Sequence, residues 1–163
     1  MRLAGRAVWI AMAVTALASA QMKISGTLTC AKPDPMHSVD VGDSKAHSLT
    51  VMQNKCTWTK PIEIEGVQAK DDIGTGVSDA RANMSHDQGY DVTTMANGDK
   101  LFVRNMGTSK MTPNGPGSMQ GKWSFTGGTG KFKGIKGGGT FTGTGKPDGT
   151  AEINVEGEYT LGK

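Results

Sequence analysis

The last forty residues constrain the fold most, because they alternate apolar and polar side chains and are punctuated by glycine. One side of residues 151–161 carries Ala151, Ile153, Val155, Gly157, Tyr159 and Leu161, and the other carries Glu152, Asn154, Glu156 and Glu158. This period of two is typical of a β-strand with one buried face. Residues 146–150, KPDGT, predict a tight turn just upstream, with Gly149 in the left-handed position of a G1 bulge. The resulting antiparallel hairpin sets Phe141 opposite Val155.

A second hairpin is predicted where Asn97-Gly98 separates two alternating segments within residues 90–105. Asn and Gly both tolerate positive φ, so the pair favours a two-residue type I′ turn. That turn sets Val92 opposite Val103, which gathers apolar groups on one face of the hairpin.

Between these hairpins the alternation is interrupted. Glycines follow Phe125 closely, and Phe132 and Ile135 then lie three residues apart, the spacing of a single helical turn. We expect both side chains to plug one end of a closed sheet. Three glycines at residues 137–139 then allow a tight return into a strand.

The upstream part of the chain gives weaker patterns. Residues 22–30 predict a strand whose inward side carries Met22, Ile24, Gly26, Leu28 and Cys30. Two prolines end this strand, and the polar residues 33–46 are expected to form a loop. Residues 47–58 predict a second strand and residues 62–64 a short third one. Residues 71–83 show no clear pattern, and within them residues 77–82 fit either one helical turn or an edge strand.

Together these elements predict an all-β chain of about eight antiparallel strands, joined by short connections into a meander that closes as a barrel. Side chains fill the interior of such a barrel, or one small ligand occupies it. Strand parity assigns nine residues to the interior and to any ligand site in it: Val92, Leu101, Val103, Trp123, Phe125, Phe141, Ile153, Val155 and Tyr159. No catalytic residues are identified.

The first twenty residues have the features of a targeting segment. Arg2 and Arg6 precede an apolar run that ends in Ala18-Ser19-Ala20, which is typical of a secretory signal peptide cleaved near Ala20/Gln21. The run is shorter than the roughly 20 apolar residues of a membrane span. We therefore expect residues 1–20 to be a signal peptide and residues 21–163 to be one secreted or periplasmic barrel domain without a membrane span.

Charge excludes one class of partner. The chain has 18 Lys and Arg against 15 Asp and Glu, and removing the two signal-peptide arginines leaves 16 against 15. The mature chain therefore has no basic footprint for nucleic acid.

Two cysteines, Cys30 and Cys56, remain after the signal peptide. In an oxidising compartment a pair with no leftover thiol predicts a disulfide bond. A redox role would favour C-x-x-C spacing, which is absent.

The order W-x-F-x-G-G-T-G-K-F-x-G-I-x-G-x-G-T-F, then P-D-G and E-G-E-Y-x-L, over residues 123–161, resembles bacterial secreted members of the allene oxide cyclase barrel-like family. The hairpin residues 95–100, MANGDK, are similar to the same group. The resemblance implies an eight-stranded antiparallel barrel, related in shape to allene oxide cyclase and dirigent proteins. The plant cyclases hold a fatty-acid epoxide in an apolar barrel while it closes a ring. No polar site residue of those enzymes matches a position here, so the resemblance implies a fold rather than a reaction.

Polar residues define no local site. Asp71 and Asp72 are adjacent and would point opposite ways in an extended segment, and a solvated rim is the expectation for both. His37, His47 and His86 lack the spacing of a metal motif. Methionine is a common filler of irregular cores, so a Met/His copper site is the weakest alternative. No metal and no cofactor is expected.

These observations favour a small exported barrel that is not an enzyme. It would bind a small apolar ligand in its interior or have a structural role in the cell envelope. The alternative is a cyclase or isomerase that constrains a hydrophobic substrate in the same interior. The sequence identifies no particular ligand and no oligomeric state.

Overall fold

A computed structural model describes residues 21–113 and 115–162, so the expected signal peptide, residues 1–20, lies outside the described residues. The elements are β1 (Met22–Cys30), β2 (Met36–Asp40), β3 (His47–Lys60), β4 (Glu63–Ile64), β5 (Val67–Arg81), β6 (Met84–Met95), β7 (Lys100–Thr112), β8 (Gly115–Gly128), the 3₁₀ turn η1 (Gly130–Phe132), β9 (Lys136–Gly145) and β10 (Ala151–Thr160). Over these residues no helix is long and apolar enough to cross a membrane.

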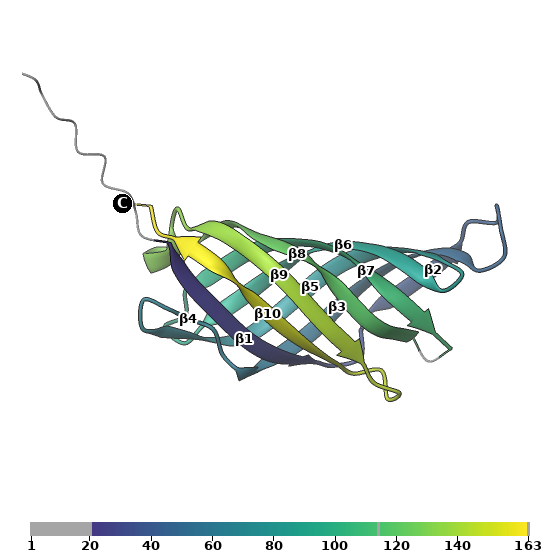
Figure 1. Ribbon diagram of the computed structural model, residues 1–163, viewed down its shortest axis with the longest axis horizontal. Coiled ribbons are helices and arrows are strands. Elements are labelled where there is room, and N and C mark those ends of the chain that lie inside the picture. The colour runs from purple at the N-terminus through teal and green to yellow at the C-terminus, as the bar shows by residue number, and fades with distance from the viewer. Residues whose placement is uncertain (1–20, 114, 163) are drawn as a thin grey trace, which may run out of the picture.

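Eight of the strands close a barrel (Figure 1). The wall runs β1-β3-β5-β6-β7-β8-β9-β10, and β10 pairs with β1 to complete the circle. Every pairing is antiparallel, and each wall strand neighbours the next one along the chain. The predicted eight-stranded meander is therefore confirmed. The short strands β2 and β4 are additions, and Figure 1 shows them at opposite ends of the barrel.

The end of the barrel near β4 and η1 holds the main apolar core. Its most deeply buried side chains are Ile64, Met95, Leu101 and Phe132. Phe132 lies in η1, and Ile135 follows it with 2% of its surface exposed. The prediction that one helical turn plugs this end is confirmed.

The hairpin between β9 and β10 has the predicted geometry. The Lys146 amide donates to the Thr150 carbonyl at 2.8 Å, and Gly149 has φ +86°. Phe141 pairs with Val155 as expected. Proline, aspartate and glycine at their preferred turn positions explain why the sequence defines this register.

The hairpin between β6 and β7 differs from its prediction by one residue. The Met95 amide donates to the Asp99 carbonyl, and Gly98 alone among the turn residues has a positive φ. A type I′ turn needs positive φ at both central residues, so this loop is a longer turn ending in a left-handed glycine. Val92 consequently pairs with Phe102 instead of Val103. This shift places Val92 on the outer face, which corrects its predicted place in the interior.

Two upstream predictions are also corrected. The segment expected to be a loop, residues 33–46, contains β2, which pairs with β3. Residues 77–82, expected to be a helical turn or an edge strand, lie mostly in β5, which pairs with β3 on one side and β6 on the other. The short strand expected around residues 62–64 is present as β4.

Candidate functional site

The inner face of the barrel wall changes from apolar to polar along its length. Away from the main core, the buried inward-facing side chains include Asp72, Ser78, Ser85, Thr93 and Ser109. They come from β5, β6 and β7, where polar residues pair directly across the strands, as Ser85 does with Ser109. Burying a polar group lowers the stability of the fold unless the group is hydrogen-bonded, so each of these side chains is expected to have a hydrogen-bond partner.

Asp72 is the most deeply buried carboxyl of this region, with 6% of its surface exposed. It lies on β5 opposite Thr93 of β6, whose hydroxyl donates a hydrogen bond to Asp72 Oδ2 at 2.5 Å. Burial raises the pKa of Asp72, and the Thr93 hydrogen bond opposes that rise.

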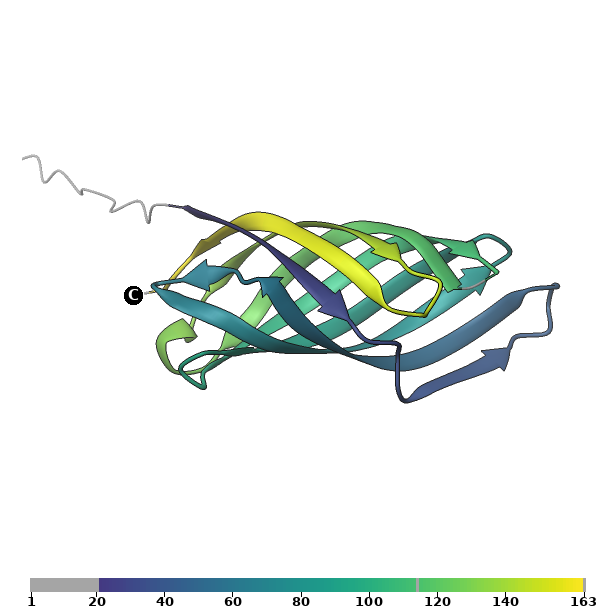
Figure 2. The same cartoon turned by 90° about the horizontal axis from the view of Figure 1, so that it is seen from below.

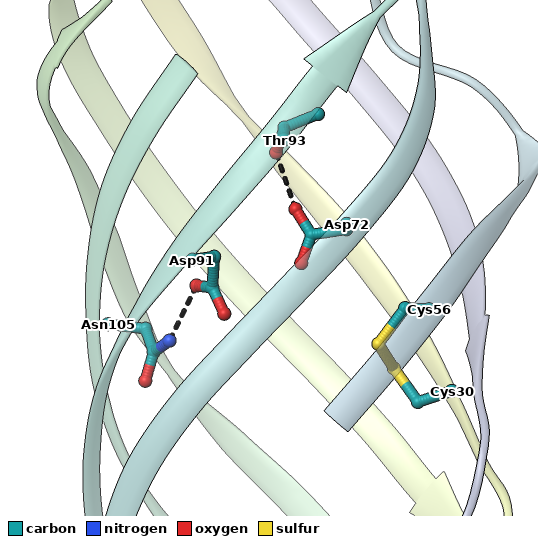
Figure 3. The surroundings of a disulfide bond; sticks show 6 residues. All are labelled: Cys30, Cys56, Asp72, Asp91, Thr93 and Asn105. Carbon is teal, nitrogen blue, oxygen red and sulfur yellow. Dashed lines mark hydrogen bonds between the residues drawn. A yellow bond between two sulfur atoms is a disulfide. The ribbon is translucent and has the colours of Figure 1, made fainter. Parts of the chain in front are cut away.

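Asp91 is the second carboxyl and projects from β6 toward Asp72 (Figure 3). Asn105 Nδ2 donates a hydrogen bond to Asp91 Oδ2 at 2.6 Å. Burial raises the pKa of Asp91 to about 7, with a further contribution from the negative charge of Asp72, while the Asn105 hydrogen bond lowers it. Gly74, opposite Asp91, provides the space: a Cβ there would lie 2.7 Å from Asp91 Oδ1.

A third inward carboxyl, Asp87, accepts hydrogen bonds from Ser109 at 2.5 Å and from Ser85 at 3.1 Å. We call Asp72, Asp87 and Asp91 the acid cluster. Within the described part of the chain, none of the three forms a salt bridge with a basic side chain. The acid cluster is therefore a group of inward-facing carboxyls without a basic partner among the described residues.

The predicted disulfide is present and borders this region. Cys30 of β1 and Cys56 of β3 are direct cross-strand partners joined by a disulfide bond. Cys56 in turn pairs with Asp72, so the disulfide and the first carboxyl lie side by side on adjacent strands (Figure 3). The disulfide packs against Leu28 in a small second apolar cluster.

Eight of the nine residues predicted to line the interior lie in or against the two apolar clusters. The main cluster includes or contacts Leu101, Val103, Trp123, Phe125, Phe141, Val155 and Tyr159. Ile153 contacts the second cluster, and Val92 alone lies on the outer face. Trp123 and Phe125 pack edge to face with ring centroids 5.0 Å apart. Whether these residues bind a ligand stays a prediction.

The sequence does not predict the acid cluster because the predicted register of the β6–β7 hairpin is one residue away from the observed one. With Val92 directed inward, parity places Asp91 and Asp87 outside. Leu101 was correctly assigned to the interior, but its partner was not: the longer turn sets Thr93 opposite Leu101, so that Thr93, Asp91 and Asp87 all point inward. For Asp72, the expectation of a solvated rim was wrong, although its neighbour Asp71 is exposed on the other face as an extended segment requires.

Two grooves follow the outer surface. The larger, of about 920 Å³, runs across strands from β3 to β9 past Leu49, Val77 and Met106. The smaller, of about 270 Å³, lies over β1, β9 and β10. Asp87 is among the residues that line the larger groove, whereas Asp72 and Asp91 line neither groove and belong to the interior.

His47 is the one buried histidine of the described residues, and it lies outside the barrel wall under the loop that precedes β3. Its Nδ1 contacts Asp43, and its Nε2 lies 3.1 Å from Asp79 Oδ1. The two carboxylates contact opposite nitrogens of one ring and do not converge on a common point. Over the described residues, no group of three or more His, Cys, Asp and Glu side chains is arranged to hold a metal ion.

Comparisons with known proteins add a fold likeness. No protein-family model and no curated protein matches the chain. The pterocarpan synthase dirigent protein GePTS1 matches with a TM-score of 0.50 and 15% identity, covering 95% of this chain and 100% of that one. The pterocarpan synthase dirigent protein PsPTS1 gives 0.49 and 13%, covering 88% and 97%. A pyocyanin demethylase gives 0.44 and 17%, covering 82% and 98%.

At these identities the likeness shows the fold alone. The chain is a closed antiparallel barrel of the dirigent type, and the eight-stranded architecture predicted from the sequence is confirmed. The finer assignment to a bacterial secreted family of allene oxide cyclase-like barrels stays a prediction.

Proposed function

We propose that this barrel binds a small ligand that combines an apolar body with a positive charge or several hydrogen-bond donors. The observation that carries the proposal is the acid cluster, in which Asp72 is buried and Asp87 and Asp91 are half-buried. Carboxylates held in an interior without a basic partner weaken a fold. A ligand that supplies donors or a cation would offset this cost, because charge-assisted hydrogen bonds to a carboxylate are strong.

Apolar contacts for such a ligand lie beside the carboxyls. Val103 is the direct cross-strand partner of Asp91, and Phe125 is the partner of Val103 on the next strand. A ligand whose cationic group reaches Asp91 would therefore place its apolar body against these side chains. Ligand sites of this type combine a mainly apolar lining with a few converging polar groups.

Three probes with one aromatic skeleton test the proposal: phenethylamine, phenylacetate and ethylbenzene. We expect phenethylamine to raise the Tm in a concentration-dependent manner, because a ligand that binds only the native state stabilises it. The Asp72→Asn/Asp91→Asn double variant should lose this shift, and Asp71→Asn, adjacent but exposed on the outer face, should retain it. An equal shift with all three probes, or no shift with any of them, would refute the proposal.

A second candidate function is proton transfer, as in a cyclase or isomerase. The specific observation is the pKa of about 7 for Asp91, raised by burial and then by the charge of Asp72. Two neighbouring carboxyls that share one proton at neutral pH provide an acid and a base together. Conversion of cyclohex-3-enone to its conjugated isomer, followed by ultraviolet absorbance, tests this function. Activity should be lost in Asp91→Asn, and absence of activity in the unmodified protein would refute proton transfer on this substrate.

We also infer that the mature protein is exported and begins at Gln21. The inference rests on the signal-like residues 1–20 and on the disulfide between Cys30 and Cys56, a bond typical of oxidising compartments. N-terminal sequencing of protein recovered from an exporting host should begin at Gln21. Protein that retains Arg2 and remains in the cytoplasm would contradict the inference.

A further inference from the structure

We propose that β2 is a self-association edge, through which two copies of the chain pair antiparallel about a two-fold axis. Figure 2 shows β2 running along the outer part of β3, with no strand beside its other edge in that view. Among the described residues, β3 is the only strand that pairs with β2. All five residues of β2 are exposed. A free edge of this kind is a template for another strand.

Backbone hydrogen bonds identify which groups are free. The Gln53 amide donates to the Pro35 carbonyl, and the Val41 amide donates to the His47 carbonyl. In an antiparallel ladder the bonded positions alternate, so odd-numbered residues of β2 bond to β3. The amides and carbonyls of Met36, Ser38 and Asp40 consequently point away from β3, toward the free edge.

Only a few symmetric registers use these free groups. Centring the axis on Asp40 would set two carboxylates opposite each other, and centring it on His37 would set two imidazoles opposite and leave Val39 unpaired. Centring it on Ser38 would pair all five residues of β2, but it would set Val39 opposite His37 and Met36 opposite Asp40, so that apolar side chains face polar ones. Centring it on Val39 sets Ser38 opposite Asp40 of the second copy, so that a hydroxyl faces a carboxylate. The two Val39 side chains then meet at a non-hydrogen-bonded pair, where opposing residues approach most closely.

The outer face explains why this register is favoured. Val39 is 68% exposed, the most exposed large hydrophobic side chain of the described chain, and its partner Leu49 on β3 is 51% exposed. Val51 and Val77 continue the apolar face on β3 and β5. Pairing about Val39 joins this face to its copy in one apolar row, Leu49–Val39–Val39–Leu49. Exposed apolar patches of this kind mark interaction surfaces.

β2 lacks two of the features that protect edge strands against pairing, and its one acidic residue, Asp40, faces Ser38 of the second copy in this register. Natural edge strands carry lysine or proline to prevent association. Residues 36–40, MHSVD, contain neither, and Pro35 lies just before the strand. The self-complementary arrangement of serine and aspartate about Val39 makes a second copy the fitting occupant of this edge.

Sedimentation velocity across a concentration series tests the proposal on the mature protein. We expect a monomer–dimer equilibrium, which Val39→Lys should shift to monomer. Ile73→Lys is the matched control, because Ile73 is also an exposed hydrophobic residue on the outer face, but it lies on β5 away from β2. A protein that stays monomeric at all concentrations, or that forms an oligomer unaffected by Val39→Lys, would overturn the proposal.

Cross-linking tests the register itself. The Val39→Cys variant should form a covalent dimer on mild oxidation, because the two introduced thiols face each other across the axis. The Leu49→Cys variant should not, because its two copies are separated by both β2 strands. Equal cross-linking of the two variants would exclude pairing about Val39.

Discussion

Asp91 combines burial with a like charge nearby, and both effects favour its protonated form. Its pKa in the folded chain is about 7, above the ordinary value of 3.8. Between these two values the folded state binds more protons than the unfolded state, so the free energy of unfolding falls as pH rises from about 4 to 7. For one proton the slope is at most about 1.4 kcal/mol per pH unit.

We therefore predict that Asp91→Asn stabilises the protein at pH 8 and flattens the dependence of stability on pH between about 4 and 7. The variant keeps an acceptor for Asn105 but has no charge to bury. Urea unfolding at a series of pH values measures both effects. Asp71→Asn, at an exposed outward-facing position, is the control and should leave the pH dependence unchanged. A parallel pH profile for Asp91→Asn would show that Asp91 titrates normally in the folded chain.

Glycine on the inner face of β8 shows a second effect of single residues. A Cβ on Gly121 would lie 2.3 Å from the Met106 carbonyl oxygen and 2.6 Å from the Phe141 ring, whereas a Cβ on Gly127 would meet only Phe102, at 3.6 Å. We predict that Gly121→Ala destabilises the barrel by about 1–3 kcal/mol through overpacking. Gly127→Ala on the same strand should be nearly neutral. Denaturant midpoints measure both, and equal midpoints would show that the Met106 backbone and the Phe141 ring both adjust at little cost in stability.

At the scale of elements, the disulfide fixes β1 against β3. It closes a loop with a sequence separation of 26 residues, which includes all of β2. We predict that replacing both cysteines by alanine lowers the free energy of unfolding by about 3 kcal/mol, mainly because the unfolded chain becomes less constrained. Urea unfolding of the oxidised protein and the variant measures the loss. A loss well below about 1 kcal/mol would show that residual structure already constrains the unfolded loop.

Hairpins show how far the sequence predicts the elements. The KPDGT turn was predicted in the correct register because each residue occupies a position that its own chemistry favours. Asn97-Gly98 fits two turn types, and in the structure Asn97 accepts a hydrogen bond from the Asp99 amide, which stabilises the longer loop. The longer loop shifts the register by one residue from the predicted one. In the observed register Val92 lies on the outer face, and Asp87 and Asp91 lie on the inner face, where the predicted register does not place them.

The strand β5 could not be recognised from its pattern because its polarity is inverted. Ile73 and Val77 are exposed on the outer face, while Asp72 and Ser78 are buried. The usual rule that the apolar side of a strand faces the core therefore points the wrong way here. This inverted pattern lies where β5 contributes Asp72 to the acid cluster, and departures from regular patterning are expected where function competes with stability.

For the whole molecule, these observations describe a barrel with two unlike ends. One end is filled by Phe132, Leu101 and their apolar neighbours, and it contributes most of the burial that stabilises the fold. The other end, toward β2, has a polar interior and an apolar exterior. The proposed self-association edge lies at this second end, and the carboxyls of the proposed ligand site lie between it and the main core; on both proposals, binding would stabilise the polar half.

This division predicts a gradient in hydrogen exchange. Backbone amides near Leu101 and Tyr159 should exchange slowly, because opening there exposes the main core, and amides of β2 and the first half of β3 should exchange much faster. Raising the protein concentration should then slow exchange at Ser38 and Asp40, whose amides pair across the proposed dimer axis. Mass-spectrometric exchange at two concentrations measures both effects, with Val39→Lys as the control that removes only the second. Uniform protection along the chain would contradict the gradient, because it would mean that the polar half unfolds only together with the core.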